Sequence, residues 1–105
     1  MKDINLFLNH SLQKLYFANY GRDLILEFAS SYDGSDLGFI KCSGVEMFYC
    51  NMNETVNHLD DEDGFFPRLI HEIACLKLDG YVLLNIDQEI TIQVRCLNID
   101  CHKTD

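Results

Sequence analysis

The chain has 105 residues, which is enough for one hydrophobic core and too few for two, so we expect residues 1–105 to form a single domain. Hydrophobic residues make up 48% of it and charged residues 24%, which argues against intrinsic disorder, and no apolar run approaches the roughly 20 residues of a membrane-spanning helix. The 17 acidic against 8 basic residues give a formal net charge of −9, which disfavours nucleic acids and anionic membranes as direct partners. Such a charge either attracts basic proteins or cations or serves only solubility.

The first half of the chain predicts four β-strands, because its apolar residues follow strand-like patterns and each run ends at a turn signal. Tyr20-Gly21-Arg22 is short enough to join the first two strands as a hairpin, and Asp33-Gly34 supplies the residues of a tight connection. Ser43-Gly44 is either a turn or a bulge. The predicted strands span residues 12–19, 23–30, 37–42 and 45–52, and in the second of them Leu24, Leu26 and Phe28 share a face.

The second half predicts a short helix followed by further strands. Apolar residues within 66–74 recur at helical spacing, and Pro67 suits a first helical turn. Asp79-Gly80 between two apolar runs is the strongest hairpin signal in the chain. In the last strand the apolar phase shifts by one residue at Cys96-Leu97, which predicts a β-bulge. These strands span residues 75–78, 81–86 and 90–101.

The connections predict how the strands pair. Most are short, and a parallel crossover needs a dozen or more residues, so we expect sequential antiparallel pairing. The polar segment 53–64 is the longest gap between apolar runs and is the clearest loop. The predicted fold is mainly β: an antiparallel meander that forms a curled sheet or a small β-sandwich, with at most one short helix near residues 66–74.

The cysteines and the N-terminus predict a cytoplasmic location. There are five cysteines with no paired spacing, and three of them lie in apolar strand-like runs, which is typical of reduced thiols that fill a core. The first five residues place Asp3 beside the only early lysine, Lys2, which makes a poor signal peptide. The cysteines are Cys42, Cys50, Cys75, Cys96 and Cys101.

No motif predicts a catalytic, cofactor or metal site. The acidic run beginning at Asp60 does not fit a calcium-binding loop, because Leu59 occupies the first ligand position and Ile70 the closing one. The histidines and cysteines lack the close spacing of structural zinc sites, and the serines lie outside any nucleophile motif. We therefore expect a binding protein and not an enzyme.

Acidic residues beside aromatic ones are the candidates for a partner-binding surface. Exposed aromatic side chains with polar surroundings are typical of protein interfaces. The alternatives are that the acids form solvated loops and that tyrosines at turns cover the core. The candidate residues are Tyr32, Asp33, Asp36, Asp60, Asp61, Glu62, Asp63 and Phe65.

Short segments spread over most of the chain, from about His10 to Cys101, occur in a characteristic order. They are His10-Ser11, Leu15-Tyr16-Phe17, Asp23-Leu24-Ile25-Leu26-Glu27-Phe28, Phe39-Ile40, Gly44-Val45 and Asp79-Gly80-Tyr81-Val82-Leu83-Leu84. This order resembles small bacterial β-proteins, the immunity proteins encoded beside polymorphic and contact-dependent toxins. The resemblance implies an inhibitor that occupies a toxin's active or substrate-binding surface, and the acidity of the chain suits a basic target. We expect His10 itself to hydrogen-bond the backbone at the start of a strand.

The leading hypothesis is therefore a cytoplasmic protein-binding inhibitor, an immunity protein that neutralises a basic toxin. One alternative is a structural β-module whose exposed strand edge pairs with its own copy. Another is a small enzyme whose site is assembled from distant residues, with His58, His71 and the acidic loop as its first candidates.

Overall fold

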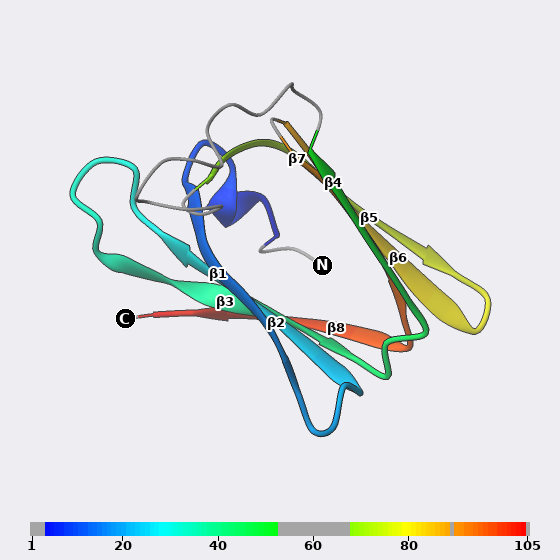
Figure 1. Ribbon diagram of the computed structural model, residues 1–105. Coiled ribbons are helices and arrows are strands. Elements are labelled where there is room, and N and C mark those ends of the chain that lie inside the picture. Colours follow the sequence, from blue (N-terminus) through cyan, green and yellow to red (C-terminus); the bar gives the residue numbers. More distant parts are fainter. Residues whose placement is uncertain (1–3, 53–67, 89, 105) are drawn as a thin grey trace.

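The computed structural model describes residues 4–52, 68–88 and 90–104. This part of the chain consists of antiparallel strands and one short 3-10 helix (Figure 1), which confirms the mainly-β prediction. No helix among these residues is long and apolar enough to cross a membrane. In chain order the elements are η1 (Ile4–Phe7), β1 (Ser11–Ala18), β2 (Asp23–Ala29), β3 (Asp36–Ser43), β4 (Met47–Met52), β5 (Arg68–Leu78), β6 (Tyr81–Gln88), β7 (Ile90–Cys96) and β8 (Asn98–Lys103).

The strands form two layers that face each other as a small sandwich (Figure 1). Hydrogen-bonded neighbours follow the order β4-β7-β6-β5-β1-β2-β3-β8. In the middle of that order β1 and β5 pair only at Ser11–Leu69 and Leu12–Arg68. The order therefore divides into a first sheet, β1-β2-β3-β8, and a second sheet, β5-β6-β7-β4.

The helix predicted near residues 66–74 is wrong. Residues 68–78 form the strand β5, which pairs with β6 from Ile70–Gln88 to Leu78–Tyr81. A register shift between Ile70 and Glu72 interrupts the regular alternation of this strand. Because a bulge moves the side-chain phase by one residue, apolar spacings of three or four residues occur in a strand as well as in a helix. Only the pairing with β6 shows that this segment is a strand and not a helix.

The predicted sequential pairing is correct for two meanders, β1-β2-β3 and β5-β6-β7, and wrong for the strand that follows each of them. β4 leaves the first meander and pairs with β7, whereas β8 leaves the second meander and pairs with β3. If β1 is exchanged with β5, β2 with β6, β3 with β7 and β4 with β8, the result is the same strand order read in the opposite direction. The topology is therefore two-fold symmetric, with each half contributing one strand to the other's sheet.

The two places where the chain changes sheets lie against each other. The backbone N–H of Leu97 donates to the carbonyl of Ser43 at 3.0 Å. Gly44 has a φ of +66°, and a Cβ at this position would lie 2.7 Å from Cδ1 of Leu97. The prediction placed a turn or bulge at Ser43-Gly44 and a bulge at Cys96-Leu97. The phase change is confirmed, but its cause is that the chain passes from one sheet to the other.

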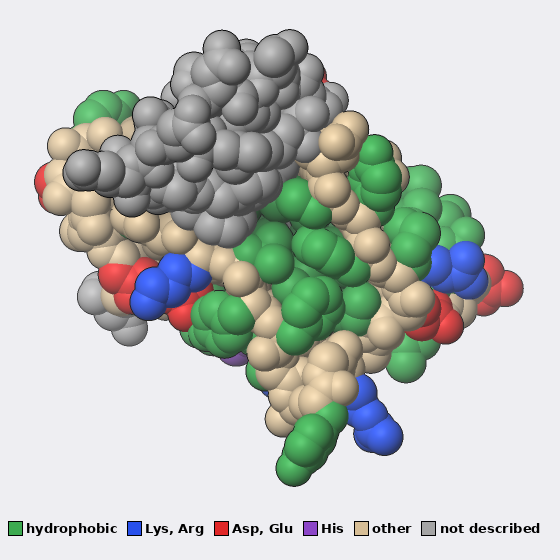
Figure 2. Space-filling view, viewed as in Figure 1, with side chains coloured by type: hydrophobic (Ala, Val, Ile, Leu, Met, Phe, Trp, Pro, Cys, Tyr) green, Lys and Arg blue, Asp and Glu red, His purple; other side chains and the backbone are tan. Residues whose placement is uncertain are grey.

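The core lies between the sheets, where Figure 2 shows hydrophobic side chains gathered and charged ones towards the periphery. On β2, Leu24, Leu26 and Phe28 all point inward and are at most 1% exposed, which confirms their predicted common face. Phe7 of η1 stacks on Phe28 with ring centroids 4.3 Å apart. The buried core cluster consists of Phe7, Leu12, Leu24, Leu26, Phe28, Ile40, Cys42, Val82, Leu84, Ile86, Ile92, Val94, Cys96 and Ile99.

All five cysteines are free, in agreement with the predicted reduced thiols, although Cys50 is exposed. Cys42 and Cys96 are buried near the C-terminal ends of β3 and β7, just before the chain changes sheets. The Cys42 thiol donates a hydrogen bond to the sulfur of Cys96, which raises the pKa of Cys42 and lowers that of Cys96. Cys96 in turn donates to the carbonyl of Asn98 at 3.5 Å. The two thiols therefore join the sheets within the core.

Candidate functional site

The outer face of the first sheet carries the candidate site. Side chains alternate between the two faces of a strand, so Ile25 and Glu27 point away from the core because Leu24, Leu26 and Phe28 point into it. The strand registers place Tyr16 and Lys41 on either side of Ile25. Residues from three neighbouring strands thus share one outward surface.

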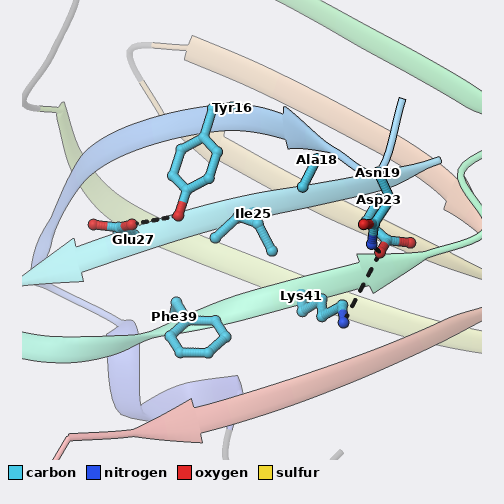
Figure 3. Close-up of a pocket in the computed structure, with 8 residues that line it drawn as sticks. All are labelled: Tyr16, Ala18, Asn19, Asp23, Ile25, Glu27, Phe39 and Lys41. Carbon is cyan, nitrogen blue, oxygen red and sulfur yellow. Dashed lines mark hydrogen bonds and ion pairs between the residues drawn. The ribbon is translucent and has the colours of Figure 1, made fainter. Parts of the chain in front are cut away.

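A shallow depression of about 300 Å³ occupies the middle of this surface (Figure 3). Its lining comes from β1, the β1–β2 turn, β2 and β3. The backbone beneath it is held by antiparallel ladders, so all of the lining side chains except Asn19 are positioned by strands. The lining residues are Tyr16, Ala18, Asn19, Asp23, Ile25, Glu27, Phe39 and Lys41.

Tyr16 and Glu27 form one polar edge of the depression. The Tyr16 hydroxyl donates to Oε2 of Glu27 at 2.6 Å (Figure 3). Losing the phenolic proton would break this hydrogen bond and place two negative charges together, so the pKa of Tyr16 is raised above its ordinary value. The hydroxyl is therefore held in its protonated, donating form.

Asp23 forms the opposite edge and is almost fully buried, at 8% exposed. Its carboxylate accepts a hydrogen bond from Nδ2 of Asn19 and lies 3.9 Å from Nζ of Lys41. Asn19 and Tyr20 both have positive φ, of 53° and 59°, in the tight turn that brings Asn19 back over Asp23. A buried charge needs such partners, and we therefore assign Asp23 to the structure of the turn.

The floor between these edges is apolar. Ile25 on β2 and Phe39 on β3 are diagonal neighbours, with Ala18 at the rim (Figure 3). Phe39 also stacks on His102 of β8, with ring centroids 4.5 Å apart and planes inclined by 16°. This contact fixes the Phe39 ring against a strand that is distant in sequence.

An apolar floor with polar edges binds a side chain or a small ligand by burying apolar surface and directing hydrogen bonds. The arrangement is therefore suited to recognition.

The sequence-predicted partner residues that the structure describes lie outside the depression. Tyr32 and Asp33 belong to the exposed connection between β2 and β3, and Asp36 begins β3. The Asp33 carboxylate accepts a hydrogen bond from the backbone N–H of Ser35 at 2.9 Å, and this bond lowers the pKa of Asp33. The Asp36 carboxylate accepts a hydrogen bond from the backbone N–H of Gly38 at 3.2 Å. These three residues lie together at one end of the first sheet, outside the depression. The other candidates, Asp60, Asp61, Glu62, Asp63 and Phe65, lie outside the described residues.

The role expected for His10 is confirmed. It directly precedes β1, and its Nδ1 accepts a hydrogen bond from the backbone N–H of Ser31 at 3.2 Å. Its ring also meets the edge of Tyr32, with centroids 5.9 Å apart. His10 therefore ties the start of β1 to the β2–β3 connection. Of the histidines named for the alternative enzyme hypothesis, His58 lies outside the described residues.

Comparison with known proteins relates this fold to a family. A protein-family model matches residues 5–103. The chain belongs to that family. It is also similar to a protein of known structure, described as an uncharacterized protein from Neisseria gonorrhoeae, with 34% identity and a TM-score of 0.82. The similarity covers 91% of this chain and 92% of the neisserial chain. No curated protein matches the sequence.

In this family member, sequence reasoning missed the residues that line the depression. The alternation along β2 already indicated that Ile25 and Glu27 point outward. The residues that flank them were not indicated, because that depends on the registers of β1 and β3 against β2. A hairpin prediction with an assigned turn type would have brought Tyr16 close to Ile25.

Proposed function

We propose that this protein is a protein-binding domain whose partner docks on the outer face of the first sheet. The observation that supports this most is the depression at Ile25 and Phe39, with its apolar floor and hydrogen-bonding edges. Such a pocket in the middle of a rigid sheet is suited to receive an anchoring side chain of a partner.

Exposed tyrosines lie at the edge of the depression and in the turns at both ends of β2. Tyr16 at its edge is 43% exposed, Tyr20 in the adjoining turn is fully exposed, and Tyr32 beyond the other end of β2 is 91% exposed. Tyrosine is among the residues that contribute most to binding at protein interfaces. With a strand rise of about 3.3 Å per residue, β2 separates the two turns by roughly 20 Å. The predicted residues Tyr32, Asp33 and Asp36 would then contact the periphery of the same partner.

The net charge of −9 favours a basic partner, because opposite potentials accelerate association. We propose that this partner is a basic toxin domain and that the chain is its cytoplasmic inhibitor, as the resemblance to immunity proteins implies. The neisserial relative is bacterial, which is compatible with such a system.

The proposal is tested by finding the partner and mapping its footprint. A basic toxin encoded beside this gene should co-purify with the chain, and expression of the chain should protect cells from it. Binding should slow amide hydrogen exchange in β1, β2 and β3. Failure to protect cells would remove the inhibitory role, and a footprint confined to the second sheet would remove the proposed face.

A matched pair of variants makes the test specific. Ile25→Arg fills the depression with a bulky charged side chain, and we expect it to weaken binding by more than about tenfold, as loss of an anchoring contact does. Gln93→Arg adds the same side chain to an exposed position on β7 in the second sheet. It should leave the affinity unchanged, and equal losses in the two variants would contradict the proposed face.

A further inference from the structure

We propose, building on the protein-binding role above, that the depression on the first sheet is a receptor for an arginine side chain of the partner. Its Glu27 edge accepts hydrogen bonds, its floor is apolar, and the ring of Phe39 in that floor is held in place by its stack on His102. Each of these features matches one part of an arginine side chain.

The hydrogen-bonding capacity left at the Glu27 edge of the depression consists of acceptors, whereas the remaining donors lie at the Asp23 edge. The Tyr16 hydroxyl uses its proton on Glu27, and Nδ2 of Asn19 donates to Asp23. The ammonium group of Lys41 lies 3.9 Å from Oδ2 of Asp23, so its charge is paired at the opposite edge from Glu27. A carboxylate offers about four acceptor positions, of which Tyr16 occupies one on Glu27, and the phenolic oxygen and the Asn19 carbonyl accept as well. A ligand that meets Glu27 must therefore bring donors. Lysine, arginine and tryptophan side chains bring donors only, and of these lysine and arginine also carry the positive charge that complements a carboxylate.

The floor selects for a long aliphatic stem with a planar end. Ala18, Ile25 and Phe39 provide an apolar surface against which methylene groups pack. Phe39 is held by its stack on His102, so the ring is already oriented when a ligand arrives. A guanidinium group is planar, stacks on aromatic faces and pairs with a carboxylate through two parallel hydrogen bonds, whereas an ammonium group is a strongly hydrated point charge. These properties favour arginine over lysine.

The surrounding charges decide which carboxylate the ligand meets. Asp23 is buried and is accompanied by Asn19 and Lys41, so its charge is largely compensated. Glu27 is the more accessible carboxylate, and Lys14 lies opposite it in the β1–β2 ladder. Lys14 and Glu27 both line a smaller hollow beside the depression. We therefore expect an arginine ligand to pair with Glu27, with Lys14 as a competing cation.

The test uses the full chain and small probes, so it needs no identified partner. N-acetyl-arginine methylamide is titrated into the ¹⁵N-labelled protein, with the lysine and citrulline analogues as controls. We expect saturable shifts at the amides of Ile25, Phe39 and Lys41 with the arginine probe and weaker binding of lysine. Citrulline has nearly the shape of arginine but no charge, and it should bind about tenfold more weakly, the loss typical of a charge-assisted hydrogen bond.

Variants of the two groups around the depression complete the test. Glu27→Gln keeps the size of the side chain and should weaken arginine binding by about tenfold, whereas Lys14→Gln should strengthen it. Glu46→Gln is the matched control, because Glu46 is an exposed carboxylate beside Arg95 of the second sheet. It should change nothing. Equal binding of citrulline and arginine, equal or tighter binding of lysine, or unchanged binding in Glu27→Gln would overturn the assignment.

The outcome also separates this assignment from the proposed function. A protein partner that docks on the first sheet, combined with no saturable binding of the arginine probe, would overturn the arginine site and keep the protein-binding role. Arginine binding dependent on Glu27 supports the site even if the partner's footprint falls on the second sheet.

Discussion

Replacing Gly38 with alanine should destabilise the protein more than the loss of glycine flexibility alone explains. Gly38 lies on β3 opposite Lys103 of β8, with a φ of +137°. A Cβ built there would lie 2.0 Å from the carbonyl oxygen of His102, which is backbone and cannot rotate away. The backbone strain amounts to about 1–3 kcal/mol. Separating β3 from β8 forfeits further hydrogen bonds of about 1 kcal/mol each, so we expect a total loss of about 3–5 kcal/mol.

Gly21→Ala is the matched control. Gly21 also has a positive φ, of +86°, but nothing lies within 4 Å of a Cβ at that position. This variant should therefore lose only about 1 kcal/mol. Equilibrium unfolding in urea, followed by circular dichroism, gives both free energies by linear extrapolation. If Gly38→Ala loses no more than Gly21→Ala, the close approach of β3 and β8 is refuted, and with it the position of Phe39 against His102.

Three further predictions concern ionisation, packing and thiol access. The phenol of Tyr16 should ionise above its ordinary pKa of 10.0, so its hydrogen bond is present at neutral pH and is lost as the pH rises through the raised value; Glu27→Gln should lower this pKa in an absorbance titration, and an unchanged titration would contradict the bond. Leu26→Ala removes a fully buried side chain and should destabilise the fold by about 2–5 kcal/mol in urea unfolding. Leu76 is 56% exposed, so Leu76→Ala should cost less than about 1 kcal/mol, and similar losses in the two variants would contradict the packing. A thiol reagent applied to the native protein should label the exposed Cys50 first, although slowly, because partial desolvation by its neighbours raises its pKa. Mass mapping that finds another cysteine modified first would contradict its exposure.

Local patterns in the sequence predicted the strands whose side chains alternate without interruption. In β2 the inward residues Leu24, Leu26 and Phe28 follow one another at every second position, so both the strand and its buried face could be identified. β5 was misread because its register shift near Ile70 breaks that alternation. An interrupted strand and a short helix have similar apolar spacing, and only the partner strand separates them.

The candidate site was less accessible to prediction because it depends on contacts between distant strands. Exposed acids and aromatics in loops, such as Asp33 and Tyr32, can be identified from the sequence because turn chemistry is local. Ile25 and Phe39 instead look like ordinary strand residues. They become the floor of a depression only through the register of β2 against β3 and through the stack of Phe39 on His102.

The sequence predicted a simple meander because the change of sheet also depends on pairing between distant strands. Ser43-Gly44 is a suitable turn, and nothing local distinguishes a hairpin from a chain that bends across to another sheet. The one-residue phase change at Leu97 is the local trace of such a bend: Cys96 faces the core from the second sheet and Ile99 faces it from the first. Because β8 crosses in this way, His102 is carried onto the first sheet beside Phe39. A substitution that blocks the crossing at Gly44, where a Cβ would strike Leu97, should therefore disturb the depression as well as the core.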